Sequence, residues 1–393
     1  MGTAVEAVRE SPAADGFTIV SDLSQLMTMR TDWNELVKAC APTPFLLVEL
    51  MRAYFKPGTR GSHPLAIVMR EKGRLVGIAA FQTKIQYLLE KPRLLKYRTA
   101  EFLLPDVLTP DFVVRPNHRR QFVEGVLSTL FDTVGCQTAL LILPTGSPNV
   151  AVLGSWCRRR GMGVWSSITS LHPVVKVRGT WNDYQASLGR QFIREVMKSK
   201  RRLERKGQLT MIKGVVDNQA VVDKILEIDR HSWKEDWKSR RNARGIKGGD
   251  DMLEGLLDYY KNSPGSELIP KCWVMELDGK PIAFAIFTTM GKIAYLEKTS
   301  FDLRYQYFSP GTCLHLSLFQ ALFDSKEVTN MDFLSMHEYM RHWRPEELTR
   351  EAFLIEGRKG AVGTLVKAAR SRYAKMVLQK VRRASHHEEI EDE

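Results

Sequence analysis

The segment that decides the fold begins at residue 273 and reads WVMELDGKPIAFAIFTTMGKIAYLEKTSFD. Alternating apolar residues flank Asp278-Gly279, a dipeptide that favours tight turns, so this segment predicts a β-hairpin. A third strand is expected to follow over residues 292–300. Three strands in close succession predict a mostly antiparallel sheet in the second half of the chain.

The next segment, LRYQYFSPGTCLHLSLFQALF, contains a helix start. Ser309 in the cap region, Pro310 in the first turn and Gly311 beside it are helix-start signals. The small residues leave the backbone N–H groups of Gly311, Thr312 and Cys313 uncovered. Because the helix dipole adds partial positive charge there, this turn suits a pyrophosphate. An ordinary helix cap that binds nothing is the alternative interpretation.

A short strand over 330–334 and a second helix carrying Tyr339 complete the order β-β-β-α-β-α. This order resembles that of the GNAT acyltransferase superfamily, and within it the CelD-like acetyltransferases, which are related to the FemAB peptidyltransferases. The resemblance is carried by Ser309-Pro310-Gly311-Thr312, Asp332-Phe333-Leu334, Glu338-Tyr339, Trp343, Leu188-Gly189-Arg190 and the segment 226–233 that ends in Trp233. Where the family often has a lysine after the tyrosine, this chain has Met340.

Earlier in the chain, the first half repeats the same elements. A hairpin turns at 71–74, extended segments and a helix over 117–131 follow, and a strand is expected at 138–143. A final strand pair is expected over 163–177. This repetition predicts an α/β (α+β) fold of tandem GNAT-like domains, each with a mixed, mostly antiparallel sheet flanked by helices. The first half has Arg115-Pro116-Asn117-His118 in place of Ser-Pro-Gly-Thr, so we assign the cofactor site to the second.

The resemblance implies an N-acyltransferase that takes acetyl-CoA or another acyl-CoA as co-substrate. Its amine acceptor, a small molecule or a glycan or lipid precursor, would attack the thioester directly in a ternary complex. On the third strand, regular alternation would place Ile293, Tyr295, Glu297 and Thr299 on one face, which makes Glu297 the candidate general base. A structural pairing with Lys298 is the alternative role for Glu297.

The family places Tyr339 where it could protonate the coenzyme A sulfur, or it could be a structural, half-buried tyrosine. The expected cofactor-binding residues are Ser309, Gly311, Thr312 and Cys313, and the expected substrate-binding residues are Arg194, Trp233, His337 and Trp343. Cys313 stands at a helix start, where the pKa of a thiol is lowered, but no adjacent base is evident. No histidine here has metal-ligand spacing, so no metal is expected.

Composition and charge narrow the class of protein. The 393 residues are 44% hydrophobic, enough for a full core, and five scattered cysteines without CxxC spacing indicate neither disulfides nor zinc. The N-terminus is not a secretory signal, so a cytoplasmic location is expected. The net charge of +13 favours an anionic partner, and much of it lies in the predicted helix 190–206.

The predicted divisions are a flexible leader at 1–16, GNAT-like halves at 17–178 and 179–358, and a basic amphipathic helix with an acidic tail at 359–393. A second basic cluster at 234–247 could form a mobile lid. The apolar stripe over 362–383 could dock on the protein itself or lie peripherally on the inner membrane face.

Two other functions fit these residues. One is a FemAB-type aminoacyl transferase, in which charged tRNA would contact the basic helix 190–206. The other is a membrane-associated binding protein without catalytic activity, anchored by 362–383. The sequence leaves the acceptor open.

Overall fold

The computed structural model describes residues 15–41, 43–55, 62–90, 93–232, 253, 257 and 270–357, and forms two compact units. Unit 1 holds the described residues up to Thr169 and from Glu351 onward, and unit 2 is Ser170–Arg350. Trp233, the lid segment 234–247, most of the leader and the C-terminal helix and tail lie outside the described residues. No described helix is long and apolar enough to cross a membrane.

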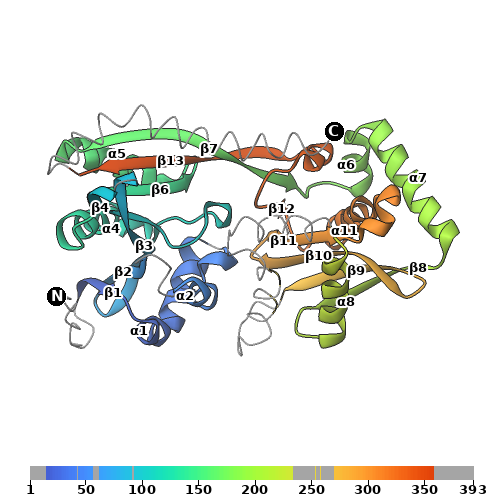
Figure 1. Cartoon of the computed structure of the whole chain (residues 1–393), viewed down its shortest axis with the longest axis horizontal. Helices are drawn as coiled ribbons and strands as arrows, with labels where there is room; N and C mark the ends of the chain where they lie inside the picture. Colours follow the sequence, from blue (N-terminus) through green and yellow to red (C-terminus); the bar gives the residue numbers. More distant parts are fainter. Residues whose placement is uncertain are drawn as a thin grey trace. The chain divides into compact units, whose positions relative to one another are not determined.

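The first half of the chain supplies most of unit 1 (Figure 1). Its elements are β1 Gly16–Val20, α1 Leu23–Thr28, α2 Arg30–Cys40, η1 Pro44–Leu46, α3 Val48–Tyr54, β2 His63–Glu71, β3 Arg74–Glu90, β4 Arg93–Phe102, η2 Asp106–Leu108, β5 Val113–Val114, η3 Pro116–His118, α4 Arg119–Ser128, η4 Thr129–Thr133, β6 Thr138–Pro144, α5 Pro148–Arg160 and β7 Gly163–Lys176. The expected strand pair over 163–177 is wrong, because β7 is a single long strand. After Gly163 the segment 163–177 contains no glycine, a residue that tight hairpin turns favour, and no turn interrupts the strand.

The second half supplies most of unit 2. Its elements are α6 Trp181–Ser187, α7 Arg190–Lys206, β8 Leu209–Val215, α8 Gln219–Arg230, β9 Lys271–Leu277, β10 Lys280–Met290, β11 Ile293–Phe301, η5 Leu303–Phe308, α11 Pro310–Ser325, β12 Asn330–Asp332, η6 Glu338–Trp343 and β13 Glu346–Glu356. The predicted hairpin at Asp278-Gly279 is confirmed as β9–β10. The predicted second helix is wrong, since Tyr339 lies in the short 3-10 helix η6.

Each unit repeats one strand arrangement. The order is β1-β2-β3-β4-β6-β13 in unit 1 and β7-β12-β11-β10-β9-β8 in unit 2. Most neighbours are antiparallel, but β4 runs parallel to β6 and β11 runs parallel to β12. In each case a helix, α4 or α11, lies between the two parallel strands in the sequence, as a parallel connection requires. The predicted fold class is confirmed, with mixed, mostly antiparallel sheets flanked by helices.

The division of the chain differs from the predicted limits. Strand β7 begins in unit 1 and passes into unit 2 at Ser170, where it pairs with β12. Strand β13 returns from unit 2 to unit 1 at Glu351, and Phe353 and Ile355 pack in the unit 1 core. Each half of the sequence therefore gives its last strand to the sheet that the other half begins.

In unit 2 the two faces of the sheet are covered by different helices. On one face Val196 of α7 and Leu314 and Phe319 of α11 pack against Ala285 and Leu296. On the other face α8 packs against Phe284 and Ile286 through its own apolar side chains, Val221, Val222, Ile225 and Ile228. Both faces of the central strands are therefore buried, and functional groups can reach solvent only at strand ends and irregularities.

Candidate functional site

Strand β11 carries a bulge at Glu297. Across the β10–β11 ladder Ile286 pairs with Lys298 and Phe287 with Leu296, so Glu297 is the extra residue. A bulge of this kind breaks the alternation of side chains. Phe301 accordingly packs on the same core as Leu296. The expectation that Thr299 shares a face with the earlier odd-numbered residues of the strand is therefore wrong.

The bulged Glu297 is half-buried and held in place. Thr288, on the neighbouring strand β10 and almost fully buried, donates its hydroxyl hydrogen to the Glu297 carboxylate. A bulge also takes backbone groups out of the ladder, so the edge of β11 can offer them to a ligand. The position and the restraint of Glu297 both suit a functional carboxylate.

Helix α11 begins at Pro310, as predicted, but Ser309 does not act through its hydroxyl. The Ser309 backbone is left-handed, with φ of 46°, and its side chain makes no capping bond. Such a conformation is uncommon outside glycine. Within the described structure the N–H groups of Gly311 and Thr312 have no acceptor, whereas the N–H of Cys313 donates to Ser309 O at 3.1 Å. Two of the three expected pyrophosphate donors are thus available.

Gly311 packs closely against the end of β11. A Cβ atom there would lie 3.3 Å from Phe301 Cδ1, at the end of β11. The helix start therefore sits directly against the strand that carries the bulge. An exposed pair of N–H groups, the helix dipole and a surface without a side chain fit a phosphate-bearing cofactor.

Cys313 is a core residue. Its thiol is fully buried and lies 3.8 Å from Val196 O of α7, and burial raises its pKa to about 12. The expected lowering of the thiol pKa at a helix start is wrong, because desolvation outweighs the dipole and the nearby Lys200. A covalent role for Cys313 has no support, and its side chain cannot contact a cofactor.

Three stacked rings stand beside this helix. Tyr339 is stacked on His315 of α11, with centroids 5.9 Å apart, and on His337 at 6.1 Å. His315, at the position four residues after Gly311, is only 2% exposed, and burial lowers its pKa to about 4. Neither of its ring nitrogens has a hydrogen-bond partner among the described residues. Sequence reasoning missed His315, a lone polar residue in an apolar helical run.

Tyr339 is exposed as a whole residue, but its hydroxyl is in a desolvated environment. Tyr339 is 37% exposed overall, yet burial around its hydroxyl raises its pKa above the ordinary tyrosine value. The hydroxyl therefore keeps its proton throughout the neutral range. A phenol of this kind can donate a proton or a hydrogen bond but cannot serve as a base.

The other expected substrate-binding residues are dispersed. Trp343 is fully buried, and the centroid of its ring lies 4.8 Å from that of Phe319. Its indole N–H has no hydrogen-bond partner within the described structure. Arg194 is exposed on α7, and His337 is exposed beside Tyr339. Burial makes a direct substrate contact by the Trp343 ring unsupported. Of the expected substrate-binding residues that the structure describes, His337 is the one whose ring stacks on Tyr339.

A buried polar network orders the segment that leads to Tyr339. The His172 Nε2 lies 2.6 Å from Asp332 Oδ2, and Arg350 Nη2 donates to His172 Nδ1 at 2.8 Å. Asp332 also accepts from Leu334 N at 2.8 Å, and Arg350 donates to Leu334 O at 2.6 Å. Leu334 has a left-handed φ of 65°. The network holds this strained turn and so positions η6.

We predict that His315 makes the protein less stable in mild acid. The unfolded chain has the ordinary histidine pKa of 6.5, so between about 4 and 6.5 only the unfolded state binds the proton. The contribution of His315 to the free energy of unfolding is fully present above pH 6.5 and is lost as the pH falls toward 4. Between about pH 7.5 and about pH 5, the free energy of unfolding should therefore fall by about 2 kcal/mol because of this residue.

Urea unfolding at the two pH values measures this effect. His315→Phe should reduce the difference by about 2 kcal/mol, because phenylalanine fits among aromatic neighbours and does not titrate. An identical pH dependence in both proteins would contradict the assignment.

A comparison with protein families finds a match that lies within unit 2. Residues 190–342 match the family model of the acetyltransferase (GNAT) domain. This GNAT match spans β8 to β12, the α11 start and Tyr339. No curated protein matches the chain. Among the described residues, no group of three or more His, Cys, Asp or Glu side chains could hold a metal ion.

Solved structures are similar over most of the chain. FemX matches with 10% identity and a TM-score of 0.54, covering 82% of this chain and 95% of FemX. The C-terminal domain of a protein assigned as a lysylphosphatidylglycerol synthetase from Agrobacterium fabrum matches with 14% identity, a TM-score of 0.50 and coverage of 88% and 96%. A conserved protein of unknown function from Bacteroides thetaiotaomicron matches with 10% identity and a TM-score of 0.51, covering 86% of this chain and 99% of that protein. At such identities these similarities show the fold alone.

Proposed function

We propose that unit 2 is an acyl-CoA-dependent N-acyltransferase of the GNAT type, with an activity like that of the CelD-like acetyltransferases. The observation that carries this proposal is the start of α11, where Gly311 and Thr312 present free N–H groups against the end of the bulged strand β11. The match of residues 190–342 to the GNAT domain supports it. The pyrophosphate of the co-substrate would accept hydrogen bonds from these two groups.

The bulge gives the thioester arm a place beside β11. The parallel pairing of β11 with β12 ends at Tyr295 and Asp332. Among the described residues, β10 is the only ladder partner of β11 beyond this pair, and an extended ligand would run along the other edge of β11. Glu297 stands in this part of the strand and would take a proton from the acceptor nitrogen, either from the ammonium form before attack or from the adduct after the neutral amine has attacked, directly or through a water.

Tyr339 would supply the proton that the leaving sulfur needs. Attack of the amine on the thioester carbon forms the C–N bond, and collapse of the tetrahedral intermediate breaks the C–S bond and releases a thiolate. The Tyr339 hydroxyl is protonated at neutral pH and would hydrogen-bond to that thiolate and pass its proton to it, and the tyrosinate left behind would then take back a proton from solvent.

We predict that Tyr339→Phe lowers kcat for acyl transfer about 100-fold and leaves acyl-CoA affinity unchanged. The assay measures free thiol released from acetyl-CoA in the presence of pooled amino sugars, amino acids and polyamines. Phenylalanine keeps the ring that stacks on His315, so the change is confined to the hydroxyl. A kcat equal to that of the wild type would remove Tyr339 from the mechanism.

The aminoacyl-tRNA alternative rests on a different observation. Helix α7 carries far more basic than acidic residues, and its exposed side chains include Arg190, Arg194, Lys198, Arg201 and Arg205. Arg202 also lies over the ring of Tyr307, which is 71% exposed, at 5.3 Å. An exposed basic helix with an aromatic ring can bind an RNA backbone. Charged tRNA that binds with steep salt dependence, in the absence of any acyl-CoA binding, would favour this function.

A further inference from the structure

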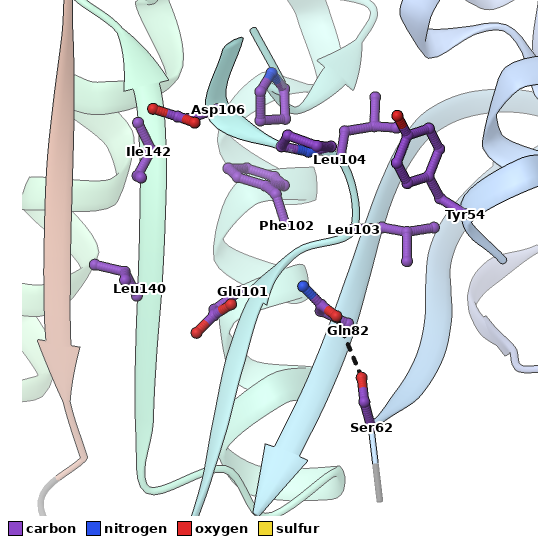
Figure 2. A pocket seen from close by; sticks show the side chains of 12 residues that line it. Tyr54, Ser62, Gln82, Glu101, Phe102, Leu103, Leu104, Asp106, Leu140 and Ile142 are labelled. Atoms are coloured by element: carbon purple, nitrogen blue, oxygen red, sulfur yellow. Dashed lines mark hydrogen bonds between the residues drawn. The ribbon is translucent and has the colours of Figure 1, made fainter. Parts of the chain in front are cut away.

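Unit 1 contains a cavity of about 450 Å³ that the proposed acyl-transfer site does not use. Figure 2 shows Leu140 and Ile142 along one wall, Gln82, Ser62 and Tyr54 along the other, and Glu101 and Phe102 between them. A volume of this size matches small-molecule sites, which range from about 300 to 1,000 Å³.

The cavity opens where two parallel strands separate. Strand β4 pairs with β6 only as far as Glu101 and Leu140. Beyond this pair β4 stays with β3, because Phe102 pairs with Phe81 and Leu103 N donates to Ala80 O at 3.0 Å. Strand β6 continues without β4, so the space between the two strands is left open.

The wall of the cavity that β6 forms is apolar. Along β6 the side chains of Leu141 and Leu143 are fully buried in the core, whereas Leu140 and Ile142 on the opposite face are only half-buried. Two neighbouring aliphatic side chains left partly uncovered inside a cavity form a surface that an apolar ligand would bury.

This position corresponds to the proposed cofactor position in unit 2, but the chemistry differs. There the parallel pair ends at Tyr295 and Asp332, and the following helix begins with small residues. In unit 1 the segment before α4 is the 3-10 turn Pro116–His118, without a glycine. The two charged residues that line the cavity, Glu101 and Asp106, are both acidic. A pyrophosphate is therefore disfavoured.

The charge of the lining selects a cation. Glu101 is neutralised by Lys84, whose Nζ lies 2.5 Å from its carboxylate. The backbone carbonyl of Asp106 accepts from Thr109 N at 2.9 Å, but its carboxylate has no hydrogen-bond or ion-pair partner among the described residues. One uncompensated carboxylate thus faces an otherwise uncharged cavity, in a chain whose net charge is +13.

We propose that this cavity binds a small organic ammonium compound, with its apolar body on Leu140 and Ile142 and its ammonium group near Asp106. A cation close to a carboxylate at a partly desolvated site is favoured over a neutral or anionic analogue of the same shape. The proposal does not depend on acyl transfer in unit 2, because the cavity is built from unit 1 residues alone.

The test uses three probes of similar size: 2-phenylethylamine, 2-phenylethanol and 3-phenylpropionate. Saturation-transfer NMR with the full chain measures their dissociation constants. We expect the amine to bind at least about 10-fold more tightly than the alcohol, and the acid not to bind. Equal affinities, tighter binding of the acid, or no saturable binding of the amine would overturn the proposal.

Asp106→Asn locates the charge. It should weaken the amine about 10-fold and leave the alcohol unchanged, since asparagine keeps the shape of the side chain and removes its charge. Asp132→Asn is the matched control, because Asp132 lies in unit 1, 55% exposed and paired with Arg160 rather than lining the cavity. Loss of amine binding in the control, or full amine binding in Asp106→Asn, would contradict the assignment.

Discussion

Gly311→Glu is expected to weaken acetyl-CoA binding at least about 1,000-fold, or about 4 kcal/mol. The glutamate side chain would fill the space in front of the free N–H groups of Gly311 and Thr312. Two charge-assisted hydrogen bonds are worth about 1.5–3 kcal/mol each, and the new carboxylate also repels the phosphates. Calorimetric titration of the variant with acetyl-CoA measures the loss.

Gly311→Ala is the matched control, because it adds the same Cβ without charge or bulk. The nearest atom, Phe301 Cδ1 at 3.3 Å, belongs to a side chain that can shift by a few tenths of an ångström. Alanine should therefore weaken binding much less than glutamate does. Retained affinity in a folded Gly311→Glu protein would show that the α11 start is not the pyrophosphate site.

Asp332→Asn is expected to lower the free energy of unfolding by about 3–5 kcal/mol. Arg350 is 1% exposed and can only donate, so His172 accepts at Nδ1 and donates at Nε2 to Asp332. Asparagine has a single carbonyl oxygen, so it can accept from either His172 or Leu334, and its NH2 group then faces the other donor. The substitution therefore removes the negative charge that opposes the buried guanidinium and also one of these two hydrogen bonds. Urea unfolding followed by circular dichroism measures the change.

A double variant separates charge from packing. If the cost of Asp332→Asn comes from an uncompensated buried cation, then Arg350→Met in the same chain should recover part of it, giving a coupling energy of about 1–3 kcal/mol. Strictly additive effects of the two substitutions would mean that Asp332 and Arg350 stabilise unit 2 independently. We also expect the single variant to loosen the turn at Leu334 and thereby reduce the precision with which η6 holds Tyr339.

The regular parts of unit 2 could be predicted from the sequence because local signals determine them. The turn at Asp278-Gly279 and the helix start at Pro310 depend on residues that favour those backbone conformations on their own. The three successive strands, the helix after them and the short strand at 330 were also predicted from local patterns. These features need no knowledge of distant contacts.

Features that depend on distant contacts were not predictable. The bulge at Glu297 appears only when β10 and β11 are aligned, and it reverses the face on which later residues lie. The exchange of β7 and β13 between the units pairs segments that are far apart in sequence. Side-chain alternation within one strand contains neither piece of information.

The chemistry of single residues also depends on burial. The sequence indicates a helix-start thiol at Cys313 and a lone histidine at 315, but only the packed structure shows the first desolvated and the second without partners in the described residues. The Asp332–His172–Arg350 network joins three strands and has no local signature. Such groups can be recognised once the strands that bring them together are known.

Calorimetric titration of the wild-type protein with acetyl-CoA and with desulfo-CoA at two salt concentrations tests the α11 start as the cofactor site. Both ligands carry the pyrophosphate, so we expect both to bind in the micromolar range, or about −8 kcal/mol, and more weakly at higher salt. Binding of neither ligand, together with tight binding of charged tRNA, would show that the α11 start is not an acyl-CoA site.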